Sequence, residues 1–167
     1  MADLPPTSIL VLADSADRFF GTPEVLAELL SLEGISDVEP APLESCDEQL
    51  LQGRSLVVVG PADPRPRTVE LLLAHAEAGG GLICLAPGEA FAAQLGLKPL
   101  MKGLRHPRVQ PDLEGFPAAG LPVRGWTQRY EGEGRVLAGL LDREGKPTEA
   151  PALLLLVLLV AYPFGMA

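Results

Sequence analysis

Short apolar runs alternate with amphipathic stretches along the first half of the chain. Three runs, 8–13, 56–59 and 82–85, are apolar almost throughout and stop at polar, glycine or proline residues, which is typical of strands buried on both faces. A weaker run, 35–39, predicts a further short strand. We therefore expect four strands within the first 97 residues.

The segments between these runs predict helices. Thr22 is placed to cap the first of them, Pro23 suits its first turn, and Gly34 ends it. Ser45 and Glu48 have capping-box spacing and predict a brief helix over 46–52. Two further helices are predicted, over 67–78 and 89–95. In the helix that begins after Thr22, Val25, Leu26, Leu29 and Leu30 recur at helical spacing, so we expect them to form the face that packs in the core.

Strand and helix thus alternate four times within residues 1–97. This alternation predicts βαβ units, which build a parallel sheet with helices on both faces, a three-layer α/β sandwich. Residues 98–167 differ, because closely spaced prolines and glycines exclude long regular elements there. Strands are expected over 123–130, 135–141 and 152–162 as an antiparallel extension at the sheet edge. We expect a single domain, 1–167.

The last of these runs, 152–162, is unbroken and apolar. A helix that crosses a bilayer needs about 20 residues, so the run is too short to span one. The N-terminus has no basic segment followed by a long apolar stretch, as a signal peptide would. We therefore expect no membrane partner, and a cytoplasmic protein or a domain excised from a larger one.

Composition and charge narrow the choice of partners. The 167 residues include 18 Gly and 17 Pro, and the formal net charge is −9. An acidic chain repels phosphate, so nucleic acid is a poor partner. The charge is uneven, because the excess of acid lies in 1–97 and 98–167 is slightly basic. A local basic cluster there could meet an anion or an acidic partner, although a solvated loop is the more ordinary interpretation; it comprises Lys98, Lys102, Arg105, His106 and Arg108.

The cysteines exclude two kinds of site. Cys46 and Cys84 lie 38 positions apart without metal-ligand spacing, which argues against a disulfide scaffold and a zinc site. No glycine-rich phosphate motif follows the first strand. We expect neither a metal nor a cofactor.

A ligand pocket is expected at the carboxyl ends of the strands, where α/β proteins bind their ligands. The loops that follow the first, third and fourth apolar runs meet at that edge. Asp14 and Asp63 could pair there as in receiver domains, but Gly60 stands where such a domain places its acid. The pocket candidates are Asp14, Ser15, Gly60, Asp63, Ala86 and Glu89.

The segment Gly-Leu-Ile-Cys84-Leu-Ala-Pro-Gly sits between a predicted strand and a predicted helix, where a nucleophile elbow projects its side chain. It resembles the Gly-x-Cys-x-Gly elbow of class I glutamine amidotransferases. The strand 56–59 before Gly60-Pro61 and the helix that ends in Ala78-Gly-Gly-Gly81 agree with this resemblance. The chain is similar to amidotransferase-like domains of multidomain bacterial proteins and of β-galactosidase-type modules, which implies a flavodoxin-like sheet.

Departures from the catalytic pattern imply that the domain is not an enzyme. Leu82 and Ala86 replace the two elbow glycines. The family's His-x-Glu pair follows the cysteine, whereas here His75-Ala-Glu77 precedes it and the only later histidine is His106. A thiol without a base is usually inert, so Cys84 is expected to be a buried strand residue, with Cys84 and His106 as a weak catalytic pair.

Three functions remain open on the sequence. The leading one is a non-catalytic structural or interaction domain, which binds other domains of a parent protein or a second copy of itself. The second is a hydrolase or amidotransferase that uses Cys84 with His106. The third is a small-molecule module, for instance for carbohydrate, with Trp126 and Tyr130 as stacking surfaces, although packing on an edge strand is the commoner role. The apolar run 153–160 is expected to be covered by a neighbouring domain or a second copy.

Overall fold

The computed structural model describes residues 9–15 and 22–156. These residues form two compact units, one ending at Phe91 and the other running from Ala92 to residue 156. The change in the sequence pattern near residue 97 lies a few positions after this division. That the two units make one domain stays a prediction.

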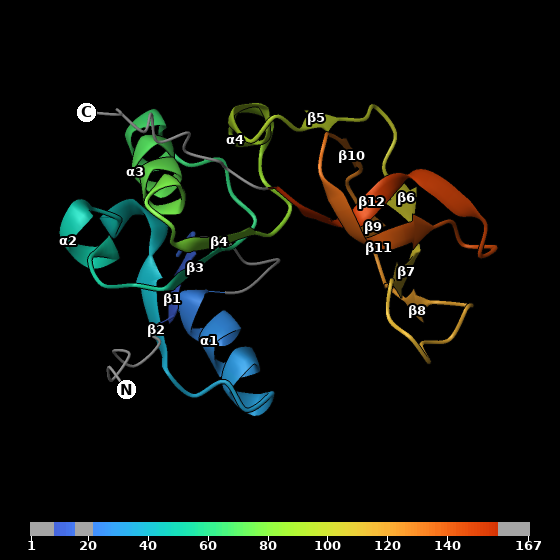
Figure 1. Ribbon diagram of the computed structural model, residues 1–167, viewed down its shortest axis with the longest axis horizontal. Helices are drawn as coiled ribbons and strands as arrows, with labels where there is room; N and C mark the ends of the chain where they lie inside the picture. Colours follow the sequence, from blue (N-terminus) through green and yellow to red (C-terminus); the bar gives the residue numbers. More distant parts are fainter. Residues whose placement is uncertain (1–8, 16–21, 157–167) are drawn as a thin grey trace, which may run out of the picture. The chain divides into compact units, whose positions relative to one another are not determined.

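The first unit holds a parallel sheet of four strands, drawn from blue to green in Figure 1. Its order is β2-β1-β3-β4, and the first strand along the chain is therefore internal. The sheet confirms the predicted α/β character. The strands are β1 (Ile9–Ala13), β2 (Val38–Pro42), β3 (Leu56–Val59) and β4 (Gly81–Cys84).

The second strand begins later than the sequence pattern predicts. Residues 35–39 were expected to pair, but the chain uses Gly34 and Ile35 to close the preceding helix, and Ile35 N–H donates to the carbonyl of Leu30. Pairing with β1 then starts where Ile9 meets Val38. Because β2 is an edge strand, it tolerates the two prolines, Pro40 and Pro42, that a central strand would exclude.

Helices connect the strands at the predicted places. One 3-10 turn precedes α2, and α3 ends in the glycine run that leads into β4. The turns and helices are α1 (Pro23–Leu32), η1 (Leu43–Ser45), α2 (Glu48–Leu51), α3 (Pro66–Glu77) and α4 (Glu89–Gln94).

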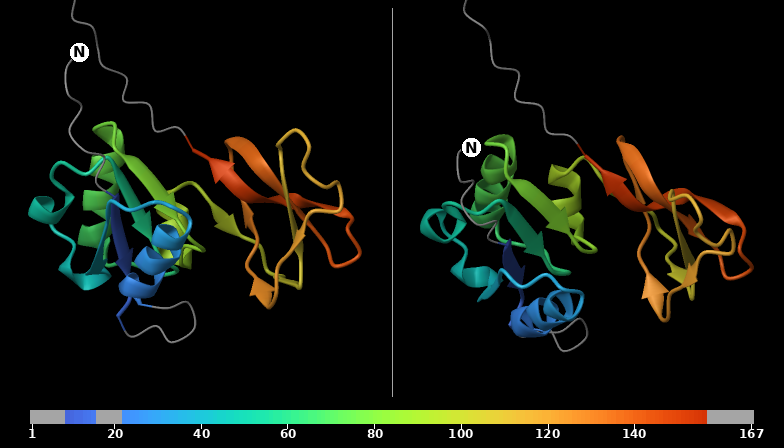
Figure 2. Two further views of the ribbon diagram at one scale, coloured as in Figure 1. Left: turned by 90° about the horizontal axis from the view of Figure 1, so that it is seen from below. Right: turned by 60° about the horizontal axis from the view of Figure 1, so that its bottom comes forward.

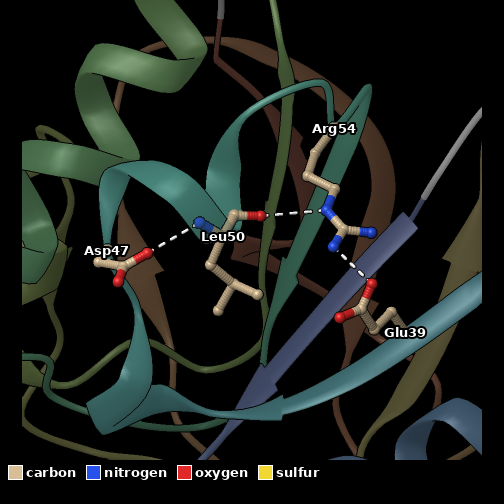
Figure 3. Close-up of polar contacts among 4 residues, drawn as sticks. All are labelled: Glu39, Asp47, Leu50 and Arg54. Carbon is tan, nitrogen blue, oxygen red and sulfur yellow. Dashed lines mark hydrogen bonds and ion pairs between the residues drawn. The ribbon is translucent and has the colours of Figure 1, made fainter.

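The predicted capping box at α2 is wrong. Asp47 caps this helix, because its Oδ1 accepts a hydrogen bond of 2.8 Å from the backbone N–H of Leu50 (Figure 3). Ser45 instead donates its hydroxyl to the carbonyl of Pro42. Figure 3 also shows Arg54, whose guanidinium donates to the carbonyl of Leu50 and pairs with Glu39 on β2. These bonds fasten α2 to the edge of the sheet.

The predicted inner face of α1 is also partly wrong. Pro23 and Ala27 are buried, whereas Val25 and Leu29 are exposed. The helix therefore packs against β1 and β2 through small residues and leaves an apolar stripe outside.

The core of the first unit is mainly aliphatic, as the scarcity of aromatic residues predicts, although Phe91 is also fully buried. Leu10, Val11 and Leu12 of β1 and Val57 of β3 are fully buried, as is Leu72 of α3. Burial of this kind stabilises the sheet by about 25 cal/mol per Å² of apolar surface.

The second unit is built from antiparallel pairs (Figure 2). We expected these strands to extend the parallel sheet, but among the described residues they form separate sheets. The reason is that the proline-rich segment supplies short strands that pair with them locally. β5 (Lys98–Pro99) pairs with β10 (Tyr130–Glu131), β6 (Leu104–Arg105) pairs with β9 (Trp126–Thr127), and a four-stranded sheet has the order β12 (Pro147–Leu155), β11 (Arg135–Leu141), β7 (Arg108–Pro111), β8 (Leu121–Pro122).

The long apolar run near the C-terminus contributes its first part to β12. This edge strand exposes Leu153 and Leu155, while residues 157–162 of the predicted strand lie outside the described residues. Within 9–15 and 22–156, no helix combines the length and the apolar character that crossing a bilayer requires.

Candidate functional site

The predicted ligand pocket falls on the carboxyl edge of the parallel sheet. β1, β3 and β4 end together at Ala13, Val59 and Cys84, because the register pairs Leu12 with Val59 and Val59 with Cys84. The predicted candidates follow these strand ends. Their local contacts show which of them have structural roles.

Asp63, in the loop after β3, caps the N-terminus of α4. Its Oδ1 accepts a hydrogen bond of 2.9 Å from the backbone N–H of Phe91, in the first turn of α4. Gly88 precedes α4 and has no side chain to cap it, and a Cβ at Gly88 would lie 2.5 Å from the Cβ of Asp63. The carboxylate of Asp63 thus takes the place of the missing cap and fastens the loop after β3 to the loop after β4.

Gly60 is a packing position. Its N–H donates to the carbonyl of Leu12, and a Cβ there would lie 3.0 Å from the Cβ of Ala13 and 3.3 Å from Cδ1 of Leu26. The absence of a side chain lets α1 close over the ends of β1 and β3. Gly60 is buried and offers no side chain to a ligand.

Ser15 faces a residue that the sequence pattern did not single out. Its hydroxyl donates a hydrogen bond of 2.9 Å to Glu44, which lies in the turn η1 after β2. Backbone hydrogen bonding, the Ser15 hydroxyl and the charge of Arg65 lower the pKa of Glu44. Ser15, Glu44 and Arg65 thus bring polar groups from three strand ends to one exposed place.

Asp14 and Glu89 are exposed on the same edge, Asp14 after β1 and Glu89 at the start of α4. Among the described residues, no three histidine, cysteine or acidic side chains gather as a metal site would require. The two exposed carboxylates make this edge polar.

Cys84 is the last residue of β4 and carries a free, half-buried thiol. Burial raises its pKa to about 12, so the thiol stays protonated at neutral pH. Among residues 9–15 and 22–156, no charged group lowers that pKa. A nucleophilic cysteine needs a neighbouring base or cation, and the surroundings of Cys84 have the opposite effect.

The positive φ that a nucleophile elbow requires occurs at Ala86 and not at Cys84. Outside glycine, positive φ occurs among the described residues at Ala86, with φ 43°, and at His106, with φ 52°. Cys84 keeps the extended backbone of its strand and pairs with Val59. The bend thus comes two residues after the thiol, at an exposed alanine that has no side chain for chemistry.

The two histidines have local roles. His75 lies in the last turn of α3, before the start of β4, whereas Cys84 lies at the end of β4. Its Nε2 is buried without a hydrogen-bond partner in the described part of the chain, and a Cβ at Gly80 would lie 2.2 Å from that atom. His106 belongs to the second unit, where its Nδ1 accepts the N–H of Gly125. The pairing of His106 with Cys84 stays a prediction.

The other cysteine lies beside a shallow hollow of about 330 Å³ between α2 and α3. Burial and the charge of Asp47 raise the pKa of Cys46 to about 11. At the rim, Arg67 pairs with Glu48 at 2.8 Å and with Glu70 at 3.3 Å. These exposed ion pairs contribute little to stability, and Cys46 is as inert as Cys84.

The two aromatic candidates of the second unit differ. The Trp126 side chain on β9 is 70% exposed, whereas Tyr130 is partly buried and has its pKa raised by that burial. Of the two, Trp126 alone offers a largely open ring face.

Comparisons with known proteins give no family. No protein-family model matches the chain, and no curated protein matches it. The resemblance to amidotransferase-like domains therefore depends on the quoted motifs alone.

Proposed function

We propose that the chain is a non-catalytic, amidotransferase-like structural or interaction domain of a larger protein or of an oligomer. The observation that carries this proposal is the protonated, half-buried Cys84 thiol at the point where an amidotransferase would carry its nucleophile. An enzyme of that kind needs a thiolate, a base and an elbow, and the surroundings of Cys84 favour none of them.

The proposal includes a flavodoxin-like, three-layer arrangement for the first unit. The strand order β2-β1-β3-β4 supports it, because flavodoxin-like sheets begin with that order. In such sheets the edge above β1 and β3 binds ligands. Here Gly60 packs under Leu26 at the ends of β1 and β3 and offers no side chain to a ligand, which supports a structural use of the frame.

An exposed sheet edge supports the role in assembly. β12 is an edge strand, and its residues from Ala150 onward carry no charge and expose Leu153 and Leu155. Long apolar edges are normally covered, because their free N–H and C=O groups pair with other chains. We propose that a neighbouring domain of the parent protein covers β12.

A turnover and labelling experiment tests the proposal. The full chain and a Cys84→Ser variant are assayed for release of ammonia from glutamine and simple amides, and we expect no turnover above the blank in either. Turnover that the substitution abolishes would refute the non-catalytic assignment.

Alkylation gives an independent readout for the alternative, a hydrolase that uses Cys84. Cys46→Ser and Cys84→Ser each leave one cysteine, and iodoacetamide is added to both at pH 7 and pH 9. Because both thiols have pKa values near 11 to 12, we expect both to react slowly at pH 7 and faster at pH 9. Rapid labelling of Cys84 at pH 7 would favour the hydrolase.

A further inference from the structure

The exposed face of α1 is apolar in its centre and acidic along its sides. Val25, Leu29 and Leu32 lie on one stripe of the helix and are 44%, 54% and 76% exposed. Glu28 flanks the stripe on one side and Glu33 on the other, and both are exposed. We call these five residues the α1 face.

The charge on this surface is not neutralised nearby in the sequence. From residue 22 to residue 53 the chain has no lysine or arginine. Among the described residues, neither Glu28 nor Glu33 belongs to an ion pair. The α1 face therefore suits a partner that offers apolar side chains surrounded by positive charge.

The second unit carries a surface of that kind on the β6–β9 ribbon. Arg105 and Trp126 are direct cross-strand partners, so their side chains lie on the same face of the ribbon. The indole packs across Gly103, where a Cβ would lie 2.5 Å from the ring. Met101 and Arg124 are exposed, and each lies within three residues of one strand of this ribbon in the sequence. We call Met101, Arg105, Arg124 and Trp126 the Trp126 face.

The ribbon holds this surface in place. His106 N–H donates to the carbonyl of Gly125, and Gly125 N–H donates to Nδ1 of His106. Arg129 donates to the carbonyl of Lys102, which ties the strand of Trp126 to the segment before β6. Tryptophan and arginine are both enriched in binding hot spots. Within the described residues, Arg105 and Arg124 form no ion pair.

We propose that the α1 face of one copy binds the Trp126 face of a second copy. Trp126 and Met101 cover the stripe of Val25, Leu29 and Leu32, and the arginines lie against Glu28 and Glu33. The two surfaces differ, so the contact is heterologous and leaves one of each free for the next copy, which builds a ring or an open chain. This inference rests on the proposed interaction role and names its partner.

Sedimentation of the full chain over a concentration series at low salt tests the contact. We expect reversible association that weakens at 0.5 M NaCl, because salt screens the charge pairing. Glu28→Arg and Arg105→Glu should each weaken it about tenfold, and Trp126→Ala at least as much. Glu77→Arg and Arg143→Glu make the same charge changes at exposed sites elsewhere and should leave association unchanged.

Mixing gives the decisive result. The Glu28→Arg chain keeps its Trp126 face and the Arg105→Glu chain keeps its α1 face, so we expect the mixture to associate more strongly than either chain alone. The proposal is overturned if the mixture associates no more strongly than the separate variants. It is also overturned if Leu153→Lys abolishes association while Glu28→Arg leaves it unchanged. A chain that stays monomeric throughout overturns this contact but not the non-catalytic assignment, which the turnover and labelling experiments test separately.

Discussion

The carboxylate of Asp63 shows how one side chain can serve a helix that begins 26 residues later. Its bond to the Phe91 N–H gives α4 the cap that Gly88 cannot supply. We expect Asp63→Ala to lower the free energy of unfolding by about 1 kcal/mol, the usual cost of a lost cap. Denaturant unfolding measures it. Asp63→Asn keeps the accepting oxygen and is the matched control, and an equal loss in both variants would contradict the capping role.

The Ser15 hydroxyl affects the charge of Glu44. Its hydrogen bond is one cause of the lowered pKa of that carboxyl, so Ser15→Ala should move the pKa of Glu44 back toward 4.5. Since the folded pKa is lowered, this group stabilises the fold above pH 4.5 and loses that effect as the pH falls. An NMR titration of the Glu44 carboxyl measures the shift. An unchanged pKa would show that the backbone and Arg65 hold the charge alone.

At the scale of the element, the closure of α1 over the sheet depends on Gly60. An added methyl group would meet Ala13 and Leu26 inside a buried junction, so Gly60→Ala should destabilise the fold by about 1 to 3 kcal/mol. Gly139 on β11 is the control, since a Cβ there would meet its nearest atom at 3.9 Å. Thermal unfolding of both variants tests the difference. Equal melting temperatures would show that the junction has room.

The edge strand β12 makes a prediction about aggregation. Leu153 is 51% exposed, so Leu153→Lys should change stability by less than about 0.5 kcal/mol and should reduce light scattering on heating, since a charge on an edge discourages pairing. Leu140, which is 1% exposed, gives the contrast: a lysine there should unfold the chain. Scattering that is unchanged in Leu153→Lys would show that aggregation begins elsewhere.

Elements with a strong local signal could be predicted from the sequence. The β-branched run of β3, Pro23 at the start of α1 and the glycines after α3 each depend on neighbours in the chain, and each appears as predicted. The inner face of α1 could not be predicted, because it contains apolar residues on two sides and the packing of Ala27 against the sheet decides between them. Of the expected antiparallel strands, 135–141 appears as predicted, whereas 123–130 divides into β9 and β10 and the last strand begins at Pro147 rather than at residue 152. Their separate sheets depend on local pairing that no pattern specifies.

Some features of the candidate site could likewise be predicted from the sequence, and others could not. The position of Cys84 at a strand end follows from the pattern of β4, and its raised pKa follows from burial that the apolar neighbours suggest. The role of Asp63 could not be predicted, because its partner Phe91 is distant in sequence. Glu44 and Arg65 could not be predicted as neighbours of Ser15, because neither lies in a motif and only the fold brings them close to it.

At the scale of the whole molecule, charge is divided between the units. The described residues of the first unit carry thirteen carboxylates against three arginines. Like charges on one compact body repel each other, and salt screens that repulsion. We therefore expect the melting temperature to rise when NaCl is added from 20 mM to 300 mM, measured by differential scanning fluorimetry at a concentration where the chain is monomeric. A falling melting temperature would mean that favourable ion pairs outweigh the repulsion.

The cap that crosses from one loop to another also constrains how the sequence can change. Serine at position 88 would let α4 cap itself, but its side chain would occupy the space of the Asp63 carboxylate. Glycine at 88 with aspartate at 63 is one stable combination, and a capping residue at 88 with a small residue at 63 is the other. The single changes between them are each unfavourable, so homologous sequences should show positions 63 and 88 changing together.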